Sequence, residues 1–512
     1  MAERHPGQDG ACGPGRPSDD WGWWRVRARG GTATWAGRRA ARAADTASCG
    51  PTARYAPTAR YALVTRYVLT GRRAVVALLV LTATLVLPTG VPAGAPAAAA
   101  AADAGAGARP GPYAFAPGAR TAAGAERTAD AAPLDPGHTY RSSLPPRGRL
   151  FYRLRLSAAD TAYVPVTAVP PADATVSATD GIRVSVRDAN GTSCSYSSAR
   201  FGAGLSPRPV TALGQREAGK ALCQGGGTYY VLVERLDAEG SGTAASSGRW
   251  DLEIAPATEP GLAAAGPTTA PRTWDSATPE PLTGTPRDRS GGTGFATARP
   301  LGQGVWRTTL APGETRFYKV PLDWGRRLHA SAELAGSPGH GYAGGALDLS
   351  LYNPVRGYVE GASLGYTGTP KSAALAPLPP VEYGNRYAVA AGVTSVRFAG
   401  DYYLAVSLGT QLTGAFGQGP FEVTLRVRVD GRAQAAPGYA GRPVPDGVFS
   451  VTEEDREAAL TGDTGAGAGH RVMLLVAVGG LGTGTALLLL LGGWTVAARR
   501  AQTRASAQKP TA

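Results

Sequence analysis

One serine and five histidines are the first residues in this chain to test for chemistry. Residues 361–365 read GASLG and match G-x-S-x-G, the turn that presents the nucleophile of serine hydrolases, with Ser363 at its centre. That turn requires a helix after the strand. The prolines in YTGTPKSAALAPLPP oppose a long helix, and His470 is the only later histidine. We therefore predict that Ser363 is not catalytic.

Metal and cofactor motifs give no stronger signal. His329 and His340 could share a metal, but two ligands without nearby carboxylates make a weak site, so we interpret both as exposed loop residues. Asp180, Asp188 and Asn190 lie near turns and could form a calcium loop, which the sequence leaves open. The chain has no H-E-x-x-H, no paired C-x-x-C and no nucleotide-binding glycine loop. We predict no cofactor and no enzyme activity; an enzyme of unrecognised type is the alternative.

Two tyrosines are better candidates for binding. Tyr230 and Tyr403 each follow a tyrosine that belongs to an alternating apolar strand face, so their own side chains point the opposite way. Exposed tyrosines on a sheet face could stack on sugars or contact a protein. Alternatively, the sheet face that carries these tyrosines is a second buried face and lies against a covering loop. The sequence leaves both interpretations open.

Cys194 and Cys223 are predicted to form a disulfide. Both lie in the part of the chain that we expect to be exported, where disulfides are permitted. The bridge would close a loop of about 30 residues and stabilise the fold by roughly 3–4 kcal/mol in the chain-entropy model. The equivalent pair is missing from a second, related stretch of the chain, so the bridge is not essential to the fold.

An internal repeat explains the architecture. Residues 139–156, TYRSSLPPRGRLFYRLRL, align without a gap to residues 305–322, VWRTTLAPGETRFYKVPL. Leu150, Tyr152 and Leu154 alternate with more polar residues, which is typical of a strand with one buried face. Three further pairs recur in the same order: 182–191 with 347–357, 226–236 with 399–409, and 249–254 with 420–429. We predict two tandem antiparallel β-sandwich domains of a jelly-roll-like type.

These stretches resemble the bacterial pre-peptidase C-terminal domain family, a small β-sandwich found beside secreted proteases and on surface proteins. The resemblance covers most of residues 136–256 and 295–430, and it implies a non-catalytic accessory or binding module. It departs at the opening strand, where the family usually carries Asp before the aromatic residue and this chain has Arg or Thr. The residues that carry it are Phe151-Tyr152, Phe317-Tyr318, Asp348 to Leu351, Tyr229-Tyr230 and Tyr402-Tyr403.

The remaining ectodomain segments are predicted to be linkers. Their composition is rich in Ala, Gly, Pro or Thr and poor in large apolar residues. We expect a disordered segment at 103–135, a spacer at 257–294 and a stalk at 431–470.

An apolar run near the start indicates export. Ala74–Leu87 follows a cluster of arginines and precedes Pro88 and an Ala-rich stretch, which is the pattern of a signal peptide at 64–102 with cleavage near Ala102. An uncleaved anchor is the alternative. Residues 1–63 show no periodicity, and we interpret them as an upstream start-site artefact or a disordered cytoplasmic leader. The Ala, Gly and Arg bias is typical of a high-GC bacterium.

A second apolar run predicts a membrane span. Residues 472–498 carry no charge, are long enough to cross a bilayer, and precede the basic tail 499–512. Positive charge just past the span places the tail in the cytoplasm, so we predict a single-pass type I protein of the cell membrane with its bulk outside. Gly480 and Gly484 form a G-x-x-x-G, which could pack two spans into a homodimer or could reflect composition alone.

The charge distribution argues against nucleic acid. Of the net charge of +14, +8 belongs to residues 1–102 and +4 to residues 499–512, which leaves the body nearly neutral. We therefore expect a surface protein that presents two β-sandwich modules to a glycan or protein of the cell envelope. The alternative is an accessory subunit of a membrane export or surface-protein-processing complex.

Overall fold

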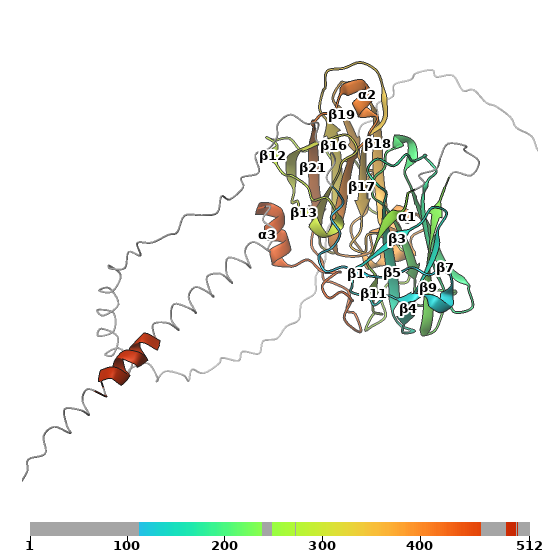
Figure 1. Cartoon of the computed structure of the whole chain (residues 1–512), viewed down its shortest axis with the longest axis vertical. Helices are drawn as coiled ribbons and strands as arrows, with labels where there is room; N and C mark the ends of the chain where they lie inside the picture. The colour runs from blue at the N-terminus through green and yellow to red at the C-terminus, as the bar shows by residue number, and fades with distance from the viewer. Residues whose placement is uncertain (1–111, 238–247, 272, 462–487, 498, 500–512) are drawn as a thin grey trace, which may run out of the picture. The chain divides into compact units, whose positions relative to one another are not determined.

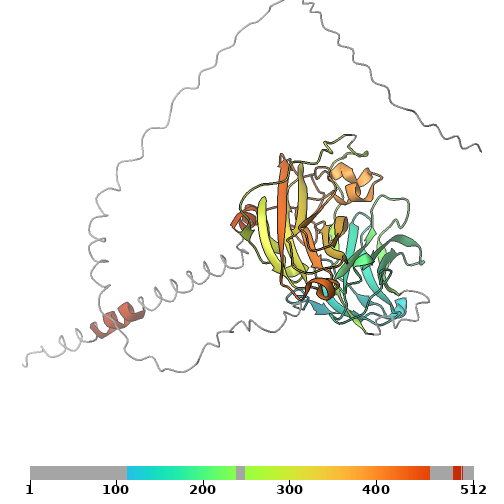
Figure 2. The same ribbon diagram turned by 90° about the horizontal axis from the view of Figure 1, so that it is seen from above.

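The computed structural model describes residues 112–237, 248–271, 273–461, 488–497 and 499. Several predicted features lie outside these residues: the leader at 1–63, the signal peptide at 64–102, most of the span at 472–498, and the glycine pair Gly480 and Gly484. Figures 1 and 2 show that strands dominate the described part and that its helices are few and short.

Repeat 1 is an eight-stranded sandwich. Its sheets have the orders β3-β10-β5-β8 and β4-β9-β6-β7, in which consecutive strands alternate largely between the two layers. This order defines a jelly roll. The strands are β3 (Tyr140–Leu144), β4 (Arg149–Leu156), β5 (Thr161–Val169), β6 (Gly181–Arg187), β7 (Ser193–Arg200), β8 (Val210–Arg216), β9 (Gly227–Leu236) and β10 (Trp250–Ile254).

Repeat 2 reproduces this order strand for strand. Its sheets are β14-β21-β16-β19 and β15-β20-β17-β18, so all four predicted sequence pairs fall on equivalent strands. The predicted duplication and the jelly-roll fold are confirmed. The strands are β14 (Gly304–Leu310), β15 (Thr315–Leu322), β16 (Arg326–Leu334), β17 (Ala343–Tyr352), β18 (Tyr358–Tyr366), β19 (Lys371–Ala374), β20 (Gly400–Leu408) and β21 (Phe421–Gly431).

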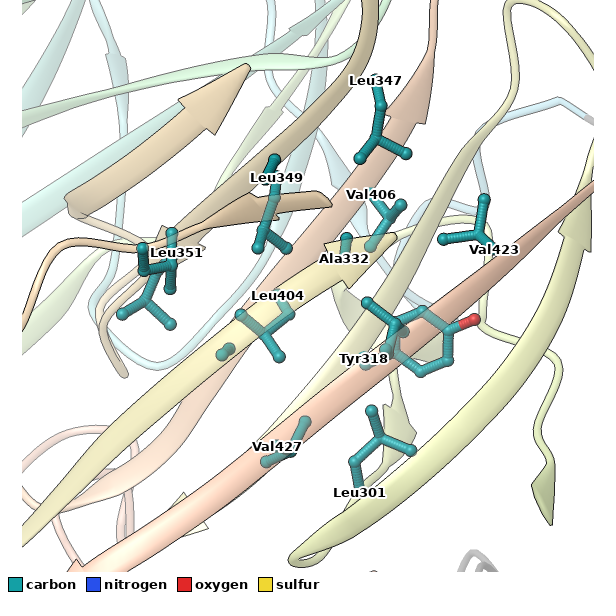
Figure 3. Close-up of a cluster of buried hydrophobic side chains, with 14 of the residues drawn as sticks. Leu301, Tyr318, Ala332, Leu347, Leu349, Leu351, Leu404, Val406, Val423 and Val427 are labelled. Atoms are coloured by element: carbon teal, nitrogen blue, oxygen red, sulfur yellow. The ribbon is translucent and has the colours of Figure 1, made fainter. Parts of the chain in front are cut away.

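The alternating residues form the cores, as the period of two requires. In repeat 1, Leu150, Tyr152 and Leu154 are nearly or fully buried between the sheets. In repeat 2, side chains from both sheets meet in the same way; Figure 3 shows Leu347, Leu349 and Leu351 of β17 near Val423 and Val427 of β21.

Each repeat begins earlier than the sequence predicted. The expected disordered segment 103–135 is ordered from residue 112 onward, and the expected spacer 257–294 contains strand β11, which pairs with β5. Two short parallel strands and a 3-10 turn precede each sandwich, because their backbone hydrogen bonds complete the sheet edges. They are β1 (Arg120–Thr121), η1 (Thr128–Asp130) and β2 (Ala132–Pro133) before repeat 1, and β12 (Arg287–Asp288), η3 (Phe295–Thr297) and β13 (Arg299–Pro300) before repeat 2. The added strand β11 (Ala257–Glu259) follows repeat 1 and is antiparallel to β5.

The segment expected to be a stalk packs onto both repeats over residues 431–461. Val444 pairs with Thr258 of β11, and Phe449 stacks on Phe398 of repeat 2 at 4.7 Å. Helix α3 (Glu453–Thr461) follows, and Arg456 binds Asp323 at 2.8 Å. Composition suggested a stalk because Gly and Pro are frequent, but a few well-placed aromatic and charged residues anchor the segment.

Buried contacts join the two repeats. A small apolar cluster combines Tyr163 of repeat 1 with Val355 and Phe398 of repeat 2. Buried ion pairs also cross this junction, and they join Glu253 with Arg356, Glu259 with Arg386, and Glu217 with Arg397. Because a buried charge without its partner is strongly destabilising, these pairs hold the repeats in one arrangement.

The last described stretch, residues 488–497, is helical. Its large apolar side chains are exposed, from 52% for Val496 to 74% for Trp494. Among the described residues, no helix is both long and apolar enough to cross a membrane.

Candidate functional site: a cleft between the two repeats

The two predicted tyrosines have different surroundings. Tyr403 packs against Phe295 of η3 with ring centroids 5.2 Å apart, and the cluster also contains Phe317 and Tyr352. Burial raises the pKa of the Tyr403 hydroxyl. Tyr403 is therefore half-buried, with its ring packed against an aromatic cluster. Tyr230 is half-buried on the equivalent face of repeat 1, between strands β4 and β6.

A cleft of about 630 Å³ lies between the repeats. One wall comes from repeat 1, from strand β7 and from the outward residues of β8, which are Thr211, Leu213 and Gln215. The other wall comes from the outward residues of β17, which are Asp348, Ser350 and Tyr352, together with the turn that follows and helix α1 (Ala391–Ser395). The period of two that builds both cores thus also places these polar side chains in the cleft.

The lining combines hydroxyl and amide groups with tyrosine rings. Tyr196 of β7 and Tyr358 of β18 line the cleft and remain 75% and 53% exposed. Tyr352 lies deeper, at 6.0 Å from Tyr358 in an edge-to-face arrangement, and burial raises its pKa to about 12. The hydrogen-bonding groups of the lining include Ser195, Ser197, Ser198, Thr211, Gln215, Ser350, Asn353, Thr394 and Ser395.

The charges in the cleft are largely paired. Asp348, the only carboxylate among the lining residues, lies 3.5 Å from Nη2 of Arg208 and accepts a hydrogen bond from Oγ of Ser350 at 2.8 Å. Arg397 is buried and donates to Oε1 of Glu217 at 3.3 Å and to Gln215 at 3.1 Å. The cleft therefore offers many hydrogen-bonding groups, and its exposed lining residue Arg200 donates to the carbonyl of Thr179 and has no carboxylate partner among the described residues.

A buried arginine supports the repeat 1 wall. Arg216, the last residue of β8, is fully buried and donates to five backbone carbonyls, including those of Asp160 at 2.6 Å and Gly225 at 2.8 Å. The predicted disulfide is confirmed: Cys194 of β7 is bonded to Cys223, whose carbonyl also accepts from Arg216. Together these contacts fix the loop after β8 against the first residues of β7.

The other sequence candidates are not brought together into a site. Ser363 lies in the middle of β18, paired in register with Asp348, and not on a strand-to-helix turn. His329 lies within β16, and not in a loop as predicted; burial lowers the pKa of its imidazole. Asp188 accepts hydrogen bonds from the backbone of Asn190 and Thr192 in a tight turn. Within the described ranges, no three potential metal ligands gather.

Sequence reasoning missed the cleft. Its lining residues come from strands that are about 150 positions apart, and they are polar residues of types that are common on any surface.

Comparisons with known proteins give little information about the family of this chain. No protein-family model matches the chain, so the resemblance to the pre-peptidase C-terminal family stays a prediction. No curated protein matches either.

Among solved structures, the CBM22-1-CBM22-2 tandem domain of Paenibacillus barcinonensis Xyn10C is 15% identical over 55% of this chain and 82% of that one, with a TM-score of 0.16. The tandem CBM51 modules of Sp3GH98, a family 98 glycoside hydrolase from Streptococcus pneumoniae, are 7% identical over 58% and 84%, with a TM-score of 0.15. Likeness this low carries no argument about function.

Proposed function

We propose that this chain is a non-enzymatic, membrane-anchored binding protein and that the cleft between its repeats binds a carbohydrate of the cell envelope. The observation that carries this proposal is the lining of the cleft, in which exposed Tyr196 and Tyr358 stand beside a dense set of hydroxyl and amide groups. Sugar rings present apolar faces that stack on aromatic rings and hydroxyls that exchange hydrogen bonds, so this lining matches their chemistry.

The pairing of Arg208 and Arg397 favours a neutral ligand segment beside them, although exposed Arg200 lines the cleft without a carboxylate partner among the described residues. Arg208 and Arg397 are already engaged by Asp348 and Glu217, so a charged ligand would have to compete with these contacts. The same pairing supports binding over hydrolysis. Glycoside hydrolysis commonly uses two carboxyl groups, and the single carboxylate among the described lining residues is held by an arginine and a serine.

Two further observations support the location that we propose. The disulfide between Cys194 and Cys223 fits an oxidising compartment outside the cytoplasm. The exposed apolar side chains at 488–497 lie within the uncharged run 472–498, which is followed by a basic tail. We propose that this run is the span of a type I protein and that residues 112–461 face outward.

The test is carbohydrate binding by the full-length protein purified in detergent. Glycan-array screening would identify a neutral oligosaccharide, and calorimetry would then compare Tyr358→Ala with Tyr342→Ala. Tyr342 is 69% exposed but is not among the residues that line the cleft, so it is the matched control. We expect Tyr358→Ala to weaken binding roughly five- to tenfold, because a lost aromatic contact is worth about 1 kcal/mol.

Equal affinity of the Tyr358→Ala and Tyr342→Ala variants would remove the cleft as the site. Specific co-purification of a membrane complex that depends on residues 472–498, with no glycan bound on the array, would instead favour the role of a complex subunit.

A further inference from the structure

The outward face of one sheet in repeat 1 is strongly basic. Arg153 and Arg155 lie on β4, and Arg183 and Arg187 lie on β6, with β9 between these two strands. All four alternate with core residues, so their side chains leave the sheet on its outer side. We call these four residues, together with Tyr230 at their centre, the arginine face.

The strand register sets the geometry of the arginine face. Tyr230 of β9 is paired with Arg153 on one side and with Arg187 on the other, so the ring lies between two guanidinium groups. Neighbouring strands are about 4.8 Å apart, and alternate residues along a strand are roughly 7 Å apart. The arginines therefore form two rows roughly 10 Å apart, in which Arg153 and Arg155 are alternate residues while buried Ser185 separates Arg183 from Arg187.

The arginines of this face have no acidic partners in the described part of the chain. None of the four forms an ion pair or a side-chain hydrogen bond there, and Nε of Arg183 and Arg187 is buried without a hydrogen-bond partner. One carboxylate, Glu234 of β9, lies on the same face in register with both Arg149 and Arg183, and it pairs with Arg149 at 3.5 Å. The adjacent turn η1 adds one exposed base and two exposed acids, Arg127, Glu126 and Asp130.

The equivalent positions of repeat 2 carry no such charge. By the alignment of the repeats, Arg153 and Arg155 correspond to Lys319 and Pro321, and Arg183 and Arg187 correspond to Asp348 and Tyr352. Lys319 is neutralised by Asp401 at 2.6 Å, and Asp348 lies beside Arg208. The jelly roll itself therefore does not require arginines at these positions.

We propose that the arginine face is a second binding site and that its ligand is a linear anionic polysaccharide. Charge complementarity selects an anion, and two rows of arginine along a flat sheet suit a polymer with repeated carboxylate or phosphate groups better than a single small ion. Tyr230 between the rows provides a ring on which a sugar can stack. This site is separate from the cleft, and the proposal does not depend on the neutral ligand proposed there.

The experiment measures binding of the full-length protein in detergent to fluorescent polygalacturonate at low salt, with neutral dextran, a DNA duplex and phosphatidylglycerol vesicles as competitors. The test variant is Arg153→Gln/Arg187→Gln. The matched control is Arg299→Gln/Arg432→Gln, which removes the same charge from two exposed arginines outside this face. We expect roughly three- to tenfold weaker binding in the test variant only, with a reduced dependence on salt.

Three results would overturn the proposal. Equal loss in the test and control variants would show that net charge alone drives binding. Displacement of polygalacturonate by DNA or by vesicles, but not by unlabelled polygalacturonate, would assign the face to another partner. Unchanged binding in the test variant would exclude the face altogether. Arg153→Lys/Arg187→Lys, which keeps the charge, should retain most of the affinity and shows that the fold tolerates change at these sites.

Discussion

The same sheet face is used in opposite ways by the two repeats. In repeat 2 it is apolar and covered: Phe317, Tyr352 and Ala405 are buried against Phe295, and Tyr113 of the N-terminal segment packs on them. In repeat 1 the corresponding face carries exposed Arg153 and Arg155, and half-buried arginines stand beside half-buried Tyr230. The comparison teaches that duplication kept most inward positions apolar, which the sandwich needs, while the outward positions 153, 155, 183 and 187 diverged in charge. In repeat 2 this face is part of a junction, and in repeat 1 it is a candidate binding surface.

The largest expected effect comes from breaking the junction that covers the repeat 2 face. Glu253 of repeat 1 is fully buried and paired with Arg356 of repeat 2. Glu253→Ala leaves the Arg356 guanidinium buried without a partner, which should cost about 3–5 kcal/mol in the free energy of unfolding. Urea denaturation followed by tryptophan fluorescence measures it.

The control for that prediction is Arg141→Gln, which breaks the exposed pair with Asp251 and should cost less than about 1 kcal/mol. A loss for Glu253→Ala as small as this control would mean that the junction is not a stabilising contact and that the two faces differ less than the comparison suggests.

The next effect is confined to repeat 1, which holds the disulfide between Cys194 and Cys223. Cys194→Ser/Cys223→Ser should lower the free energy of unfolding of repeat 1 by roughly 3–4 kcal/mol, because the unfolded chain regains the entropy of an open loop. Limited proteolysis with mass spectrometry would report which repeat opens first. Cleavage of repeat 2 before repeat 1 would contradict the prediction.

The covered face of repeat 2 also predicts a response to alkaline pH. Burial raises the pKa of Tyr352 to about 12. Below the ordinary tyrosine pKa both states are neutral, and the stability is fully present. Above it the unfolded chain ionises while the folded protein keeps its proton, so stability is lost as pH rises from about 10 towards 12. At pH 11 the loss from Tyr352 should be roughly 1.4 kcal/mol.

Unfolding in urea at pH 9 and pH 11 checks this prediction. Tyr352→Phe should reduce the alkaline loss by that amount, and Tyr342→Phe, at an exposed tyrosine, should not change it. Identical pH profiles for Tyr352→Phe and the native protein would show that the face is open to solvent in both repeats.

Much of the fold was predictable because burial and strand period act on neighbouring residues. The alternation at 150–156 and 317–322 and the four ordered pairs were enough to predict two copies of one sandwich. The early start of each repeat is only weakly indicated in the sequence. Residues 120–134 and 287–301 share a glycine, two alanines, a proline and a leucine in register, which are Gly124, Ala129, Ala131, Pro133 and Leu134 with their counterparts 167 positions later.

The segments that the sequence assigned to linkers show why composition was insufficient. Residues 112–135 and 431–461 are poor in large apolar residues, yet backbone pairing and single anchors such as Phe449 and Arg456 hold them in place. A sheet edge accepts almost any residue, since the backbone makes the hydrogen bonds. Such contacts leave little signal in residue type.

The sequence by itself determined the duplication, the sandwich class and the disulfide, because each depends on residue type and spacing along one segment. It also made Tyr230 and Tyr403 candidates for a surface role. Only the tertiary structure decided that Tyr403 is covered, that a cleft forms between β8 and β17, and that four arginines share one face with Tyr230. These features depend on which outward faces meet in the folded protein. The sequence of one strand does not indicate which distant strand will lie beside it.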